Sequence, residues 1–242
     1  MLKLEKRPQQ SKKWIYLSPF LAVVITMISG GILFTILGEN PFEAIRIIFW
    51  DPLFDPNFAS YSRPQLLVKA GPLILIAIGL SFGFKAGVWN IGAEGQYIMG
   101  AIFGAGLALA FYPMESKLIF PLMIIAGALG GFLWGMIPAF LKAKLNTNEI
   151  LVSLMLVYVA ESILASVSQG LLKNPDGYGF PGSRNLQKYE SAANVEIISN
   201  SGMHWGVLFA FITVIFSYIV LTRHIQGFNI QLTGEAPRAA KF

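Results

Sequence analysis

The chain has 242 residues, of which 55% are hydrophobic and 13% are charged, and its mean hydropathy is +0.60. Because a soluble globular domain carries about 25% charged residues, this composition predicts a protein that crosses a membrane several times. The net charge of +5 is explained by basic loops at a membrane rather than by nucleic-acid binding, and the absence of cysteine excludes disulfides, thiolate metal sites and cysteine nucleophiles.

The hydropathy pattern predicts an all-α fold, a polytopic transmembrane helical bundle of about six spans. A span needs about 20 apolar residues. The apolar run near the N-terminus follows basic residues but is too long for a cleaved signal peptide, which predicts an uncleaved signal anchor. The six predicted spans are Trp14–Leu37, Gln65–Phe84, Gln96–Phe111, Leu118–Phe140, Ile150–Leu172 and Trp205–Leu221.

Charges in the connecting segments predict the orientation of these spans. The N-terminus is basic, Lys142 and Lys144 follow the fourth span, and Arg223 follows the sixth. Since cytoplasmic loops are enriched in Lys and Arg, we expect both ends of the chain in the cytoplasm. Residues 38–64 are read as a loop, and the polar loop Lys173–His204, which contains two turn sequences, is expected outside the cell.

The second and third spans are separated by a polar, glycine-rich break at residues 83–96, which read Gly-Phe-Lys-Ala-Gly-Val-Trp-Asn-Ile-Gly-Ala-Glu-Gly-Gln. Lipid cannot satisfy the backbone groups that such a break frees, so the segment must be buried in protein, line a cavity or lie at an interface. Transporters build substrate pathways from broken segments of this kind, although a cytoplasmic turn is an equal alternative. The candidate pathway residues here are Trp89, Asn90, Glu94 and Gln96, with Glu94 expected to accept hydrogen bonds from the N–H groups of the turn.

Glu161 lies in the middle of the fifth predicted span, where a carboxylate indicates a functional site. Helical spacing predicts a polar stripe of Ser153, Glu161 and Ser168 on one face. A glutamate hydrogen-bonded to another helix is the structural alternative. Immediately before this span, Leu145–Glu149 is typical of a helix N-cap, and Asn148 joins Ser153 and Glu161 as a candidate pathway residue.

Glycines four positions apart recur in three places, where they allow two helix backbones to approach closely. We interpret them as tight packing rather than as substrate contacts. The three stripes are Gly79, Gly83 and Gly87; Gly100 and Gly104; and Gly127, Gly131 and Gly135.

After the sixth span the chain keeps a small-residue segment that could form a docking surface. Thr233 is expected to cap a short helix containing Glu235, and Ala239 and Ala240 offer little steric hindrance to a partner. A disordered tail is the alternative from composition.

Residues 86–96, 146–156 and 234–242 together resemble the permease subunits of bacterial ABC importers, in the family of ribose, simple-sugar and branched-chain amino-acid permeases. The first two motifs match the nucleoside/simple-sugar branch of that family most closely, and the resemblance covers essentially the whole chain. It implies that residues 1–242 form a membrane-spanning permease domain, of which residues 223–242 begin a cytoplasmic ATPase-coupling segment. The coupling residues implied are Gly234, Glu235, Pro237, Arg238, Ala239 and Ala240.

The resemblance further implies a permease subunit of an ATP-driven importer for nucleosides or simple sugars, located in the bacterial inner membrane with a cytoplasmic N-terminus. The implied partners are a separate ABC ATPase, a second permease subunit in a heterodimer, and an extracellular or periplasmic substrate-binding protein. The sequence has no Gly-x4-Gly-Lys-Ser/Thr phosphate loop, so we expect no ATP hydrolysis by this chain and no cofactor. Two departures from the family are present. Val157 stands where many members have Asn, so the family's substrate contacts at that position are not implied here. Members continue beyond Phe242, which predicts that this chain is an N-terminal fragment.

Two other classes of function are alternatives for this sequence. A secondary transporter would use an intramembrane carboxylate, for which Glu161 or Glu94 would serve. A membrane enzyme is disfavoured because His204 and His224 lie at opposite ends of the sixth span and form no catalytic constellation with other residues.

Overall fold

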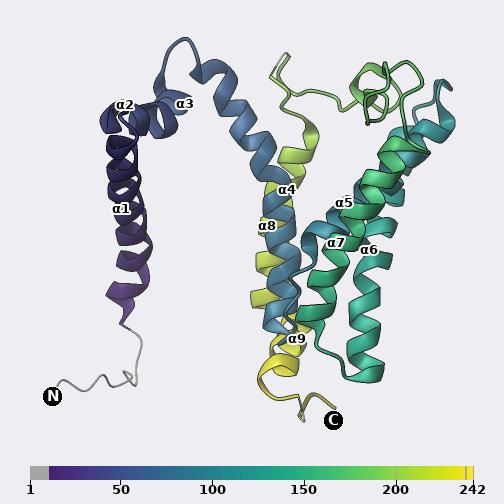
Figure 1. Ribbon diagram of the computed structural model, residues 1–242. Coiled ribbons are helices and arrows are strands. Elements are labelled where there is room, and N and C mark those ends of the chain that lie inside the picture. The colour runs from purple at the N-terminus through teal and green to yellow at the C-terminus, as the bar shows by residue number, and fades with distance from the viewer. Residues whose placement is uncertain (1–10, 200, 238, 242) are drawn as a thin grey trace. The chain divides into compact units, whose positions relative to one another are not determined.

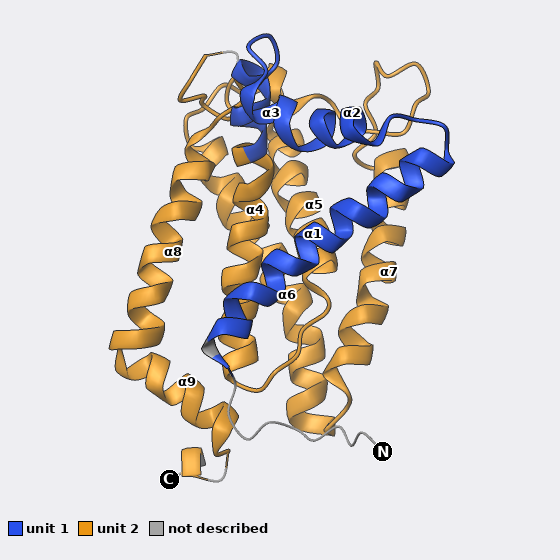
Figure 2. Ribbon diagram, turned by 90° about the vertical axis from the view of Figure 1, so that its left-hand side faces the viewer, with its two compact units in different colours: residues 1–66 blue, residues 67–242 orange. Residues whose placement is uncertain are grey.

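The computed structural model describes residues 11–199, 201–237 and 239–241, which form helices joined by loops (Figure 1). The chain divides into two compact units, residues 1–66 and 67–242, which Figure 2 shows in different colours. The all-α class is confirmed. Within the described residues, five helices are long and apolar enough to cross a membrane, namely α1 (Lys12–Ile36), α4 (Ala59–Lys85), α6 (Ile119–Leu145), α7 (Glu149–Gln169) and α8 (Trp205–Arg223).

The third predicted span forms α5 (Ala93–Phe111), which is not one of these five helices. Its first turn contains Glu94 and Gln96, so the helix is less apolar at its N-terminal end than along the rest of its length. This asymmetry suits a helix that begins inside the bundle, among protein groups, rather than at the surface of a bilayer.

In the first unit, α1 is followed by short helices where the sequence indicated a loop. α2 (Pro41–Ile45) continues through a π-helical turn (Arg46–Trp50) into α3 (Asp51–Phe54). The Asn40 side chain starts this segment by accepting a hydrogen bond from the N–H of Phe42 at 3.0 Å. The reading of residues 38–64 as a loop was therefore wrong, because a good capping residue starts helical structure in this mostly apolar segment.

α4 begins at Ala59, earlier than the predicted span, and contains Pro64. The Ser62 hydroxyl donates to the carbonyl of Pro52, and the Arg63 Nε donates to the carbonyl of Leu53 at 2.6 Å. These side chains tie the first turns of α4 to α3 and stabilise the helix ahead of the proline. The predicted start at Gln65 is therefore too late: a proline within a helix interior normally breaks the helix, but these bonds stabilise the turns before Pro64.

The second unit is organised by close contact between α5 and α6. A Cβ atom added to Gly100 would lie 3.0 Å from the carbonyl oxygen of Gly127, and one added to Gly104 would lie 3.2 Å from that of Met123. α7 also packs against α5, where a Cβ added to Gly95 would lie 3.1 Å from the Cα of Val157, and the three helices lie side by side in Figure 1. The prediction that glycine spacing marks tight helix packing is confirmed for α5 and α6.

Gly79 and Gly83 do not pack against another helix among the described residues, so the interpretation of their stripe as a packing face was wrong for them, whereas a Cβ added to Gly87 would lie 3.4 Å from the Cα of Gly234. No described atom lies within 4 Å of a Cβ added to Gly79, and Gly87 follows the end of α4 with φ +75°. A residue in this left-handed region is usually glycine, because any other side chain would be strained there. Glycines four residues apart therefore occur in two different structural roles.

The predicted external loop folds back onto the α5–α6 connection. The Tyr189 side chain is buried, its hydroxyl donates to the carbonyl of Met114, and its ring packs edge-on against Tyr112 with centroids 5.2 Å apart. Tyr189 and Ala192 share an apolar cluster with Ala108 of α5 and Ile119 of α6. This segment is therefore an anchored cap on the α5–α6 hairpin, and it contains a single 3-10 turn (Leu186–Lys188) among its described residues.

The end of α8 is followed by a bend at His224, by α9 (Ile225–Glu235), which leaves α8 at an angle (Figure 2), and by a 3-10 turn (Ala239–Lys241). His224 caps α9, since its Nδ1 accepts a hydrogen bond from the N–H of Gln226 at 3.2 Å. The expectation that Thr233 caps a short helix was wrong, because Thr233 lies inside α9 and donates to the carbonyl of Asn229 at 2.8 Å. The predicted coupling residue Arg238 lies outside the described residues.

Candidate functional site

The chain is non-helical between the end of α4 and the start of α5, at residues 86–92, as the sequence predicted. The start of α5 lies deep beside its neighbours: a Cβ on Gly95 would be 3.1 Å from the Cα of Val157 in α7, and one on Gly135 of α6 would be 3.1 Å from the Gln96 side chain. α6 continues for another ten residues beyond Gly135, to Leu145, which is about 15 Å of helix. The connection therefore enters the bundle instead of turning at its end.

Side chains satisfy the backbone groups that this break leaves free. The Asn90 Oδ1 accepts a hydrogen bond from the N–H of Gly92 at 2.9 Å. The Ser153 hydroxyl, which is 2% exposed as a residue, accepts one from the N–H of Ile91 at 3.2 Å and donates to the carbonyl of Ile150 at 3.1 Å. Irregular backbone at membrane depth is stable only with such partners.

The absence of a side chain at Gly92 allows the connection to lie against α7. A Cβ atom there would be 2.8 Å from the carbonyl oxygen of Ser153 and 2.9 Å from its Cβ. Any larger residue would push the connection away from α7 and lengthen the hydrogen bond between Ile91 and Ser153. The glycine and the serine thus form one docking point for residues 90–92.

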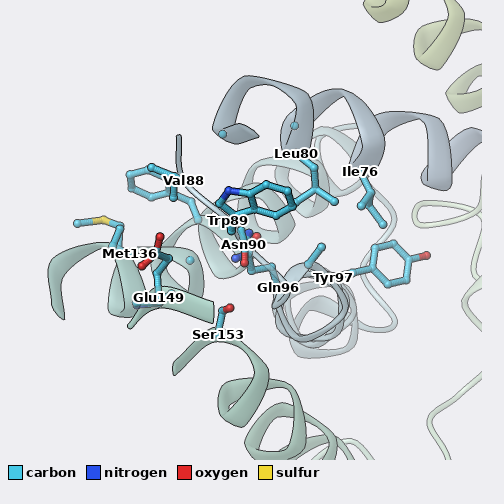
Figure 3. A pocket seen from close by; sticks show the side chains of 18 of the residues that line it. Ile76, Leu80, Val88, Trp89, Asn90, Gln96, Tyr97, Met136, Glu149 and Ser153 are labelled. Carbon is cyan, nitrogen blue, oxygen red and sulfur yellow. The ribbon is translucent and has the colours of Figure 1, made fainter. Parts of the chain in front are cut away.

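A cavity of about 780 Å³ opens beside this connection (Figure 3). Its walls come from α4, from the connection itself, from the first turn of α5, and from α6 and the start of α7. Its volume lies within the range of about 300–1,000 Å³ that is usual for small-molecule sites. The lining residues are Ile76, Gly79, Leu80, Gly83, Val88, Trp89, Asn90, Ala93, Gln96, Tyr97, Gly127, Ala128, Gly131, Phe132, Gly135, Met136, Pro138, Ala139, Lys142, Ala143, Glu149 and Ser153.

The cavity wall is mostly apolar and aromatic, with few polar groups. Trp89, Tyr97 and Phe132 supply aromatic surface, and the Trp89 ring lies 5.0 Å from that of Phe84, at 39° between the ring planes. The carboxamides of Asn90 and Gln96 supply hydrogen-bonding groups. An apolar cavity with a small number of placed polar groups can hold a small organic ligand and fix its orientation.

An ion pair lies at the edge of the cavity where α6 and α7 meet. The Lys142 Nζ is 3.0 Å from the Glu149 Oε2, and the side chains are 44% and 14% exposed. From the sequence, Lys142 contributed to the predicted orientation and Glu149 to the predicted N-cap segment, and neither was predicted to belong to a site. The available signal was their opposite charges on the two sides of the short connection between two helices.

Four of the seven predicted pathway residues line the cavity: Trp89, Asn90, Gln96 and Ser153. Asn148 does not, but its Oδ1 accepts a hydrogen bond from the N–H of Ile150 at 3.0 Å and caps α7, as capping rules predict. The structure therefore brings together the centre of the broken segment and the buried serine of α7.

Glu94 and Glu161 do not line the cavity, and the expectations attached to them are corrected. Glu94 is exposed in the first turn of α5, and it is Asn90, not Glu94, that accepts the hydrogen bond from Gly92. Glu161 is exposed, whereas Ser153 is buried. Eight residues separate them, which is about 80° around a helix, so they lie on one broad face of α7, but only Ser153 reaches the cavity.

The family of the branched-chain amino acid transport system / permease component matches residues 63–242, which include the broken connection, the cavity, α8 and α9. The chain belongs to this permease family. Because it combines this family match with several helices able to span a bilayer, it is a multi-pass membrane protein.

Individual relatives are similar to this permease-family chain over almost its whole length. It is 30% identical over 240 residues to the glucose ABC transporter permease protein TsgB13 of Haloferax volcanii, covering 94% of this chain and 61% of that protein. It is 29% identical to the nucleoside ABC transporter permease protein NupB of Lactococcus lactis, covering 93% and 62%, and 23% identical to the guanosine ABC transporter permease protein NupP of Bacillus subtilis, covering 93% and 63%.

The chain thus spans somewhat less than two thirds of the length of these relatives. No solved structure matches it significantly.

Proposed function

We propose that this chain acts as a membrane-spanning permease subunit of an ATP-driven importer, with nucleosides or simple sugars as its substrates. The observation that carries the proposal is the broken connection, which holds Trp89 and Asn90 at the wall of a cavity inside a chain of the permease family. The relatives are permeases for glucose, nucleosides and guanosine, which supports the same two substrate classes.

In this proposal the cavity is part of the substrate pathway. The carboxamides of Asn90 and Gln96 offer donors and acceptors to hydroxyl groups or ring nitrogens, and Trp89 offers an apolar face to a sugar ring or a base. Ser153 holds the connection in place through its hydrogen bond with Ile91. Asn148 contributes indirectly by capping the helix that carries Glu149.

The proposal includes partners and an orientation. The ATPase would dock on α9 and the turn Ala239–Lys241, near basic residues that favour a cytoplasmic position for this end of the chain. The N-terminus would lie on the same side, and a substrate-binding protein would dock on the opposite side. Lactococcus lactis has two nucleoside permeases that resemble this chain, NupB and NupC, which supports pairing with a second permease subunit.

Substrate uptake by the complete complex in cells tests the proposal. Asn90→Leu and Gln96→Leu should each reduce uptake several-fold to about tenfold, the effect of losing one hydrogen bond to a substrate, while the protein still reaches the membrane. Glu161→Gln is the matched control, because Glu161 is exposed and outside the cavity, and it should leave uptake unchanged.

A partner ATPase unable to hydrolyse ATP should abolish uptake. Uptake that survives this change but stops when the proton or sodium gradient is removed would replace the proposal with a secondary transporter.

A further inference from the structure

The last turn of α9 touches the backbone at the start of the broken connection. A Cβ atom on Gly234 would lie 2.2 Å from the carbonyl oxygen of Lys85 and 3.1 Å from the backbone of Ala86 and Gly87. In the reverse direction, a Cβ on Gly87 would lie 3.4 Å from the Cα of Gly234. Figures 1 and 2 both show α9 at the end of the bundle where α4 stops. This is contact between two backbones, with no flexible side chain between them to absorb a displacement.

α9 is also held against the end of α8. Gly227 lies so close to the carbonyl of Val220 that an added Cβ would be 2.2 Å from that oxygen. The Gln231 Nε2 donates to the carbonyl of Leu221 at 3.3 Å. These contacts fix α9 against the end of α8, so a displacement of the two helices carries Gly234 with it.

Two contacts hold the connection, one on each side of residues 88–90. Gly234 contacts it at residues 85–87, and Ser153 of α7 holds it at Ile91. Val88, Trp89 and Asn90 lie between these two points, and all three line the cavity. Since packed elements transmit displacement rather than absorb it, a shift of α9 relative to α7 must change the course of these residues.

We infer that Gly234 is a positioning residue for the cavity: the seating of α9 on residues 85–87 sets the position of Val88, Trp89 and Asn90 in the cavity wall. The inference rests on the proposed function for its meaning in transport, where it gives a bound ATPase a route from α9 to the substrate pathway. The contact itself and its effect on the connection are independent of that function.

The inference can be tested by the chemical accessibility of the cavity wall. The chain has no cysteine, so Val88→Cys provides a single thiol in the connection. In membrane vesicles containing the full-length permease with its partners, the rate of maleimide labelling at this thiol reports on the connection. Gly234→Leu should change that rate about threefold or more, because a side chain overlapping backbone atoms must displace one of the two segments.

Thr233→Leu is the matched control, since Thr233 is exposed on the adjacent position of α9, and it should leave the labelling rate within about twofold of the parent, as surface substitutions usually have small effects. Gly234→Ala is the milder variant. It favours the helical conformation of α9, and should still change labelling in the same direction as leucine. Equal labelling of the parent, Gly234→Ala and Gly234→Leu proteins would overturn the inference.

Uptake measured in the same vesicles separates the two proposals. Vesicles in which Gly234→Leu alters labelling and lowers uptake, but retains the ATPase, support both. Altered labelling in vesicles whose parent protein transports neither nucleosides nor sugars would refute the proposed function and leave the positioning role intact. Unaltered labelling in vesicles whose parent protein transports normally would refute the positioning role and leave the proposed function intact.

Discussion

Gly100 of α5 and Gly87 of the α4–α5 connection both belong to stripes of glycines four residues apart, but the two stripes have different structures. In the first, glycines from α5 and α6 face one another, and their backbones meet. In the second, no described atom packs on Gly79, which borders a cavity, and Gly87 forms a left-handed turn after the helix has ended, where its backbone meets Gly234 of α9. Glycine spacing therefore predicts packing along two helices where the partner helix offers a glycine stripe of its own, and a break in the helix where polar residues follow.

The largest effect is expected at the α5–α6 contact. Gly100→Leu would place a side chain against the carbonyl oxygen of Gly127, 3.0 Å from its Cβ, and neither helix can yield without losing the rest of the contact. Overpacking costs about 1–3 kcal/mol and sometimes more, and we expect the upper end of this range here. The midpoint of thermal unfolding in detergent measures the effect. Gly79→Leu is the control, and a similar loss of stability in both variants would remove the distinction between the two stripes.

A smaller effect is expected where side chains, not helix packing, hold the backbone. Ser153→Ala leaves the N–H of Ile91 without its acceptor, which should cost about 1–3 kcal/mol locally. Hydrogen exchange should become faster in residues 86–92 and remain unchanged in α5 and α6. Ser162→Ala, which removes an exposed hydroxyl bonded within its own helix, should have no such effect. Unchanged hydrogen exchange in the Ser153→Ala protein would mean that packing alone fixes the connection.

The smallest of the three effects is expected for Gly87→Ala. An alanine in the left-handed region costs about 1–2 kcal/mol, and Gly87 has φ +75°. Gly79→Ala, inside α4, should instead be neutral or stabilising by up to about 1 kcal/mol, because alanine favours the helix. Opposite signs in a denaturation series of the two variants would confirm the comparison, and equal values would contradict it.

Much of this architecture could be predicted from the sequence because membrane spans obey strong rules. Long apolar runs located the spanning helices, the polar break at residues 83–96 located the connection, and Asn148 was correctly read as a helix cap. Trp89, Asn90 and Gln96 were placed at a pathway for a physical reason, since their polar backbone has to face a cavity or protein.

The remaining features depend on contacts between distant residues. α4 extends past Pro64 because Ser62 and Arg63 bond to carbonyls of α3, which helix propensity cannot show. Glu161 looked significant because a carboxylate is rare in a span, yet a residue's depth along a helix does not reveal which way it faces. The pairing of Lys142 with Glu149 required the geometry of the α6–α7 connection.

The cap on the α5–α6 hairpin has a consequence for how the chain is made. Tyr189 and Ala192 complete the apolar cluster around Ala108 and Ile119, but they are synthesised about 70 to 85 residues after those partners. Since a chain emerges from its N-terminal end, α7 must be made while this end of the α5–α6 hairpin is still uncovered. The apolar cluster is therefore completed only after α7 has been made, when Tyr189 and Ala192 reach the hairpin.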